Sequence, residues 1–282
     1  MKERKRYAGH TGNNKMKKIE STEELQKIEL NIMRYIDRVC RENHLKYCLA
    51  YGTLLGAVRH KGFIPWDDDM DILMPRDDYE KLCDILLNQK GRYEVLECTR
   101  NKDYIYPFAK VIDTKTILIE KDVVLANRLG VYVDIFPYDG LKNDGQVRFA
   151  NALAKIRNFN MRGFASMRHN TNKWKNIPRR FWWVLLKITG HKNILKLSDW
   201  NAKRMKIDTA EKLCCMVASQ DVRNDVFRKK DISEYIEIEF EGEKFFAPKG
   251  WDVILRSTYG DYMQLPPENE RGIQHNFEAW WI

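Results

Sequence analysis

The sequence lacks the long apolar run that a membrane-spanning helix requires. Its longest apolar stretch in the central region is only Phe181–Leu186, whereas crossing a bilayer takes about 20 apolar residues. No apolar stretch follows the basic N-terminus either, so we expect no secretory signal. These absences disfavour integral membrane and secreted proteins, and we expect a cytoplasmic location.

The six cysteines lack the spacing of a metal-binding or redox motif. No two of them form a C-x-x-C pair, and no paired histidines accompany them. A structural zinc site needs four such ligands clustered at short spacing. We therefore expect reduced thiols in the core of a protein from a reducing compartment.

Acidic residues are nearly absent from residues 155–206, which hold fourteen Lys or Arg and one Asp. Residues 1–20 are also basic, with seven Lys or Arg and two Glu. The whole chain carries +9, so these segments, at +13 and +5, leave −9 for the remainder. The sequence therefore predicts an acidic body, a polar and disordered basic tail at 1–20, and one strongly basic segment.

The basic segment contains a Trp-rich apolar stretch, FWWVLL, at Phe181–Leu186, directly after Arg179 and Arg180. Pro178 suits a helix start and Gly190 a helix end. Trp favours the headgroup region and Lys or Arg meets anionic lipid, so the pattern predicts docking on an anionic membrane surface. The alternative is a core helix with a solvated basic flank. Single-stranded nucleic acid ranks last because no nucleic-acid motif is present.

Hydrophobic periodicity predicts one α+β domain over residues 21–282, in which residues 142–206 form a helical insertion. No internal repeat or low-complexity linker divides the chain. Residues 21–43 carry apolar side chains at helical spacing, and Ser21 with Glu24 forms a capping box. The other expected elements are helices at 53–60 and 76–89, a C-terminal helix starting near residue 250, and strands at 46–52, 69–75, 93–99, 108–120 and 131–139.

The strongest functional signal is GFIPWDDDMDILMPRDDY at residues 62–79, where Asp67, Asp68, Asp69 and Asp71 fall within five positions. On a strand, Asp69 and Asp71 point the same way, about 7 Å apart, while the intervening side chains face the core. Two converging carboxylates suit Mg²⁺, with Mn²⁺ as an alternative. Since Mg²⁺ is commonly shared with substrate phosphates, the pattern favours a phosphate-bearing substrate.

Two other interpretations of this cluster stay open. A solvated acidic turn is one, although the flanking apolar residues disfavour it. Asp67, Asp68 and Asp71 also match the D-D-x-x-D pattern of prenyl-diphosphate sites. That pattern needs a helix, whereas Pro65 and the alternation that follows it favour a strand.

A glycine turn upstream supports a nucleotide-dependent transferase site. In YGTLLG, Gly52 lets a phosphate approach the backbone at a helix N-terminus, and Thr53 adds a hydroxyl donor. The basic stretch Arg59, His60 and Lys61 follows. A Gly-Thr turn, a basic stretch and a strand with D-x-D describe a nucleotidyltransferase-like active site of the polymerase β type.

That fold also uses a third carboxylate from a neighbouring strand. The expected strand VYVDIFPYD, residues 131–139, offers Asp134 between apolar Val133 and Ile135. The alternative is a turn residue at a strand end.

Residues 51–79 resemble the signature of the LicD family of phosphotransferases, a group that includes fukutin and fukutin-related protein. FAKVIDTKT, VYVDIFPYDG and STYGDYMQLPP resemble further blocks in the same order, with Arg271 and His275 behind them. The resemblance covers residues 25–275, but the basic segment 142–206 matches no block.

The resemblance implies a nucleotidyltransferase-like mixed sheet flanked by helices. It also implies transfer of a phosphoalcohol, typically phosphocholine from CDP-choline, to a sugar hydroxyl of teichoic acid, lipopolysaccharide or another cell-surface glycan. Asp69 and Asp71 are then Mg²⁺ ligands, Asp134 matches the third carboxylate, and Asp67 matches a further acidic position.

Roles for the remaining residues follow from this chemistry. Asp134 would take the proton of the acceptor hydroxyl, and Lys110 joins the basic stretch 59–61 as a phosphate contact, a surface lysine being the alternative. Trp66 would hold choline through its ring face. The acceptor is expected to be lipid-linked at the inner membrane face. A nucleotidyltransferase, a CDP-ribitol- or CDP-glycerol-dependent enzyme, and a non-catalytic sugar- or nucleotide-binding module remain alternatives.

Overall fold

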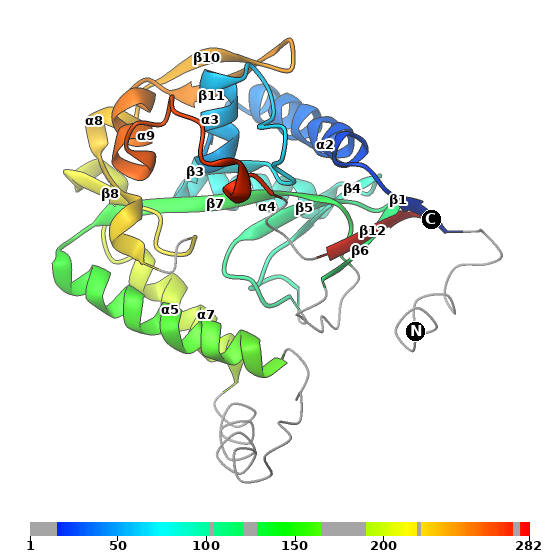
Figure 1. Ribbon diagram of the computed structural model, residues 1–282. Helices are drawn as coiled ribbons and strands as arrows, with labels where there is room; N and C mark the ends of the chain where they lie inside the picture. The colour runs from blue at the N-terminus through cyan, green and yellow to red at the C-terminus, as the bar shows by residue number, and fades with distance from the viewer. Residues whose placement is uncertain (1–15, 102–103, 121–128, 165–189, 219–220, 273–276) are drawn as a thin grey trace, which may run out of the picture.

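A computed structural model of the chain describes residues 16–101, 104–120, 129–164, 190–218, 221–272 and 277–282 (Figure 1). Its centre is a mixed β-sheet with strand order β2-β3-β7-β5-β4, extended by β8 and β9 beside the far end of β7. The strands are β2 (Cys48–Leu49), β3 (Asp71–Pro75), β4 (Tyr93–Leu96), β5 (Ala109–Asp113), β7 (Tyr132–Leu141), β8 (Lys212–Cys214) and β9 (Val226–Arg228).

The register of the three central strands places charged side chains in one row. β3 runs parallel to β7 with Asp71 opposite Asp134, and β5 runs antiparallel to β7 with Lys110 opposite Asp134. Directly paired residues on neighbouring strands point to the same face of a sheet. Asp71, Asp134 and Lys110 therefore project side by side from adjacent strands.

The other face of the sheet packs on helix α2 (Thr22–Glu42), while α4 (Arg76–Asn88) contacts β3, β4 and β7. Met70 and Ile72, which alternate with Asp71, are fully buried in one core cluster with Ile32 and Ile36 of α2. One half of the predicted capping box is confirmed, since the Ser21 hydroxyl accepts a hydrogen bond from the Glu24 N–H at 3.1 Å. The Glu24 carboxylate instead accepts the Trp281 Nε1–H at 2.8 Å. This two-sided arrangement keeps the acidic row away from the apolar core.

A second layer lies beside β2 and β3. Helix α3 (Tyr51–Arg59) contacts the hairpin β10–β11 and the C-terminal helix α9, as Figure 1 shows. The new elements here are α8 (Lys229–Ile232), β10 (Tyr235–Phe240), β11 (Glu243–Pro248) and α9 (Trp251–Tyr259).

Two further units complete the architecture. Helices α5 (Asp144–Phe164) and α7 (His191–Ala202) pack against each other below the end of β7 (Figure 1). A small antiparallel sheet has the order β1-β12-β6. Its strands are β1 (Lys17–Ile19), β6 (Thr116–Glu120) and β12 (Phe277–Trp281), and the 3-10 turns are η2 (Ile207–Thr209), η3 (Val222–Asp225) and η4 (Glu268–Glu270).

The α+β class and the six free, buried cysteines are as predicted. Three boundaries are corrected. The ordered body begins before residue 21, because β1 pairs with β12. Helix α3 starts at Tyr51 instead of residue 53, and β3 starts at Asp71 instead of residue 69. The predicted membrane-docking stretch Phe181–Leu186 lies outside the described residues, and within the described part no helix is long and apolar enough to cross a bilayer.

Candidate functional site

Two members of the charged row, Asp134 and Lys110, form a buried ion pair. The Lys110 ammonium donates a hydrogen bond to Asp134 Oδ1 at 2.6 Å. Lys110 is only 2% exposed and Asp134 only 7% exposed. Lys110 is therefore not a surface lysine, and its ammonium is already engaged by the carboxylate predicted to be the third ligand.

Aromatic rings enclose the same ammonium. Lys110 Nζ lies 3.3 Å from the ring centroid of Tyr132, 5.0 Å from that of Tyr106 and 5.3 Å from that of Phe108. Ring faces attract cations, most strongly where water is excluded. The rings and Asp134 together confine the Lys110 charge inside the sheet.

The neighbouring carboxylates come from the loop before β3. Asp67, Asp68 and Asp69 each place a carboxylate oxygen within 4.8 Å of the others. Asp69 lies in this loop, just before the start of β3 at Asp71, so the predicted strand start is corrected. The predicted alternation holds, because Asp69 and Asp71 are half-buried while Met70 between them is fully buried. The ladder with β7 begins at Asp71 and Asp134, and the Asp134 N–H donates a hydrogen bond to the Met70 carbonyl at 2.9 Å.

Electrostatics show that loop and strand carboxylates share one site. Burial raises the pKa of Asp71 well above its usual range, and the charges of Asp69, Asp134 and Asp67 raise it further, while Lys110 lowers it. The four residues predicted as metal ligands are therefore close enough to repel one another. All their ligand atoms are carboxylate oxygens, the donor type that Mg²⁺ and Mn²⁺ prefer, so the residues fit a hard divalent cation.

Sequence patterns alone missed Glu29 of α2, which lies behind the acidic loop. Glu29 is 2% exposed, and its Oε2 has no hydrogen-bond partner among the described residues. Burial raises the pKa of Glu29 well above its usual range, and Asp69, Asp68 and Asp67 add to the effect. Glu29 follows Leu25 by four residues and so lies on the apolar stripe of α2. A charged residue on that stripe was the signal in the sequence that could have identified it.

Gly52 and Thr53 both support the carboxylates. A Cβ at residue 52 would lie 2.5 Å from Asp67 Oδ2, so glycine gives this carboxylate its space. The Thr53 hydroxyl accepts a hydrogen bond from the Asp71 N–H at 2.8 Å. The preceding Tyr51 has a φ of 45°, an uncommon backbone conformation for a non-glycine residue. The phosphate contacts predicted for Gly52 and Thr53 stay predictions.

The predicted cations gather near Trp66. Arg59 donates to His60 Nε2 at 2.9 Å and to the Tyr262 carbonyl at 2.8 Å. Burial lowers the pKa of His60, and the Arg59 charge lowers it further, so a neutral imidazole accepts this bond. The His60 ring meets Trp66 edge-on at 6.4 Å, and the Arg271 guanidinium lies 5.6 Å from the Trp66 ring centroid.

Lys61 differs from these two neighbours. It is exposed, and its backbone carbonyl accepts the N–H of Glu241 in the β10–β11 turn at 2.8 Å. With a φ of 60°, it reverses the chain after α3. Its predicted role as a phosphate contact stays a prediction.

Two cavities border the site. The larger, of about 390 Å³, opens beside Asp68 between the start of α2 and strands β1 and β12. It mixes hydroxyls, charges and one ring, and is lined by Lys18, Ile19, Glu20, Ser21, Thr22, Leu25, Asp68, Phe277, Glu278 and Ala279.

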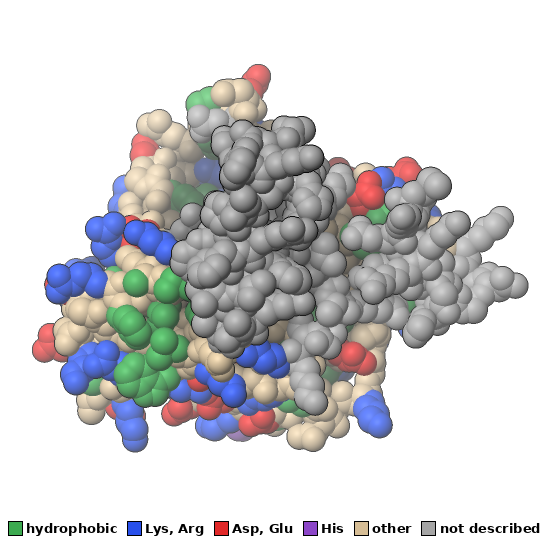
Figure 2. All heavy atoms as spheres, turned by 90° about the horizontal axis from the view of Figure 1, so that it is seen from below, with side chains coloured by type: hydrophobic (Ala, Val, Ile, Leu, Met, Phe, Trp, Pro, Cys, Tyr) green, Lys and Arg blue, Asp and Glu red, His purple; other side chains and the backbone are tan. Residues whose placement is uncertain are grey.

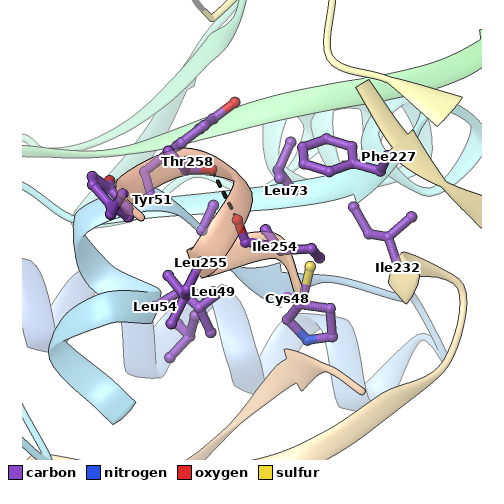
Figure 3. A pocket seen from close by; sticks show the side chains of 13 residues that line it. Cys48, Leu49, Tyr51, Leu54, Leu73, Phe227, Ile232, Ile254, Leu255 and Thr258 are labelled. Carbon is purple, nitrogen blue, oxygen red and sulfur yellow. Dashed lines mark hydrogen bonds between the residues drawn. The ribbon is translucent and has the colours of Figure 1, made fainter. Parts of the chain in front are cut away.

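The other cavity is a narrow apolar crevice between α3 and α9, shown in Figure 3. Leu54 and Leu73 face Ile254 and Leu255 there. Its free volume of about 10 Å³ is that of a single water molecule. It is a packing gap, too small for a nucleotide.

Comparisons with known proteins find a transferase family and individual relatives that resemble this chain. The family described as LicD/FKTN/FKRP, nucleotidyltransferase domain, matches residues 44–162. The lipopolysaccharide cholinephosphotransferase LicD of Haemophilus influenzae is 31% identical over 272 residues, covering 94% of this chain and 99% of the relative. An uncharacterised protein of Rickettsia prowazekii is 34% identical over 91 residues, which cover 32% of this chain and 33% of that protein.

Proposed function

Because this chain belongs to the LicD family, a family of transferases, we propose that it moves phosphocholine from CDP-choline to a sugar hydroxyl. The proposed acceptor is a lipopolysaccharide or a related cell-surface glycan such as teichoic acid. Similarity over nearly the full length of a lipopolysaccharide cholinephosphotransferase supports this proposal. The observation that carries it is the acidic site itself, in which the Asp67–Asp69 loop adjoins the row Asp71, Asp134 and Lys110. We further propose that the mixed sheet is nucleotidyltransferase-like.

The residues proposed to hold Mg²⁺, or Mn²⁺ in its place, are Asp69, Asp71 and Asp134, with Asp67 beside them. When bound, the ion supplies positive charge against the donor diphosphate and the departing CMP. The chain supplies the carboxylates already gathered, and α3 positions two of them through Gly52 and Thr53.

Proton transfer is assigned to Asp134. The acceptor hydroxyl forms a new bond to the choline-bearing phosphorus while the bond from that phosphorus to CMP breaks in line. Asp134 takes the hydroxyl proton. The 2.6 Å bond from Lys110 fixes the orientation of the Asp134 carboxylate, so Lys110 acts as a positioning residue in this proposal.

Donor and acceptor are proposed to bind on sides of the acidic loop that differ in charge. His60 and Arg271 lie beside Trp66, and Arg59 is bonded to His60, which suits a diphosphate and a choline head. The cavity beside Asp68 instead offers hydroxyls, carboxylates and the Phe277 ring. Hydroxyls, carboxylates and a ring face suit a sugar, so we assign the acceptor to this cavity.

The test is product analysis with CDP-choline, MgCl₂ and a GalNAc-bearing glycan acceptor. We expect CMP and a phosphocholine-modified acceptor, both abolished by Asp69→Ala/Asp71→Ala. Asp77→Ala is the matched control, because Asp77 lies in the same stretch but is exposed in the first turn of α4.

Other outcomes would redirect the proposal. Turnover of CDP-ribitol or CDP-glycerol alone would change the transferred alcohol, and a nucleotide left on the acceptor would identify a nucleotidyltransferase. Binding of Mg²⁺ and nucleotide without turnover of any donor would identify a binding module.

A further inference from the structure

Helices α5 and α7 expose large apolar side chains away from the faces that they pack together. Phe149 is 37% exposed and Ile156 46% on α5, while Leu197 is 40% and Trp200 57% exposed on α7. The inner faces hold other residues, such as the buried Val147. These four residues are therefore not the packing side of the helix pair.

The spacing puts the exposed residues of each helix on one face. Phe149 and Ile156 are two turns apart, and Leu197 and Trp200 are three residues apart, which places each pair along one side of its helix. Figure 2 shows the underside of the molecule, where hydrophobic side chains gather beside Lys and Arg side chains. We call the surface made by these four residues the α5–α7 face.

The charge around this face is positive. Arg148 and Lys155 are exposed on α5, as are Lys196 on α7 and Arg204 just after it. The Arg204 guanidinium lies 5.3 Å from the Trp200 ring centroid. Only two acidic residues occur within the helices, at the start of α5 and at Asp199.

The second of these acids is neutralised within the protein. Asp199 pairs with Arg76 at 3.1 Å and with Lys203 at 2.7 Å. The remaining basic side chains thus face solvent beside the apolar residues.

We propose that the α5–α7 face docks the protein on an anionic membrane surface. The pattern is that of a helix lying in the membrane interface. Its Trp side chain lies among the lipid headgroups, its other apolar side chains reach the acyl chains, and its basic side chains contact the anionic headgroups around them. Each Lys or Arg near an anionic leaflet strengthens binding by about fivefold at moderate salt.

The reason for docking rests on the proposed function, since a glycan acceptor carried by a lipid is reached at a bilayer surface. The docking itself needs no turnover. Its failure can therefore be told apart from a failure of the proposed reaction.

The experiment is sedimentation of the full chain with vesicles of phosphatidylcholine, alone or with phosphatidylglycerol. We expect binding to the anionic vesicles only, weakened by salt, and at least tenfold weaker binding for Phe149→Ala/Trp200→Ala. Arg148→Glu/Lys155→Glu should weaken binding to the anionic vesicles by a similar factor.

The matched control is Leu87→Ala/Val253→Ala, which removes residues of 42% and 43% exposure on α4 and α9. It should bind as the parent does, and CDP-choline binding by calorimetry should be unchanged in every variant. Equal vesicle binding by parent and Phe149→Ala/Trp200→Ala overturns the proposal, as does a parent that binds no anionic vesicle. A change of oligomeric state in that variant during size-exclusion chromatography would assign the face to a second copy instead.

Discussion

Replacing Lys110 by Met tests whether the buried ammonium holds the site together. The side chain keeps its length and most of its apolar contacts, but Asp134 loses the partner 2.6 Å away. At that distance the attraction is ~6 kcal/mol for an effective dielectric constant of about 20. Part of it offsets the cost of removing both charges from water.

The expected loss is therefore about 3–5 kcal/mol of unfolding free energy, because an unpaired carboxylate would stay buried. For a chain of this size the melting temperature would fall by roughly 6–20 °C. The assay is urea unfolding without Mg²⁺, with Lys115→Met as control, since Lys115 lies in the same segment but is exposed.

A double-mutant cycle separates the ion pair from general damage. Lys110→Met/Asp134→Asn removes both charges, so its cost should fall below the sum of the single changes by about 2 kcal/mol or more. Mg²⁺ should also stabilise Lys110→Met more than the parent, because the carboxylate cluster then lacks its internal cation. A loss below about 1 kcal/mol for Lys110→Met, or an additive cycle, would refute the reasoning.

Three further outcomes are expected. Gly52→Ala should displace the Asp67 carboxylate, whose Oδ2 lies 2.5 Å from the added Cβ, and lower turnover about tenfold or more at nearly unchanged melting temperature. Because folding raises the pKa of Glu29, protonation of Glu29 stabilises the folded protein. This stabilisation is fully present below pH 4.5, the pKa of Glu29 in the unfolded chain, and is lost as pH rises through the folded pKa. Glu29→Gln should therefore gain stability over the parent between about pH 5 and about pH 8 in urea unfolding. Because Asp71 must lose a proton whose pKa is raised, calorimetry should show tighter Mg²⁺ binding at about pH 8 than at about pH 6.

Local patterns predicted the parts of the site that depend on local structure. The alternation of Met70, Asp71 and Ile72 correctly gave one polar and two core-facing side chains. Asp134 was expected on a neighbouring strand, and it pairs directly with Asp71. The first prediction rests on strand periodicity, which a short segment determines by itself. The second rests on the similarity to a polymerase β-type active site, which uses a third carboxylate from a neighbouring strand.

The features that the sequence could not reveal depend on long-range pairing. The start of β3 at Asp71 depends on its pairing with Asp134 of β7, more than sixty residues later in the chain. Lys110 looks like an ordinary strand lysine until β5 pairs with β7 and three rings close around it. Strands β12 and β1 pair although they lie near opposite ends of the sequence, and no local sequence pattern predicts that pairing.

The position of the internal cation supports the proposal that the acidic site binds a divalent cation from outside. Lys110 is confined by rings and by Asp134, so it cannot move to neutralise the loop carboxylates. Burial raises the pKa of Asp71, and the charges of Asp69 and Asp67 in the loop raise it further. The Lys110 ammonium therefore neutralises Asp134 in the sheet, but the loop carboxylates Asp67–Asp69 keep their negative charge. That imbalance supports the proposed divalent cation between the loop and Asp71, where the proposed diphosphate donor would share it.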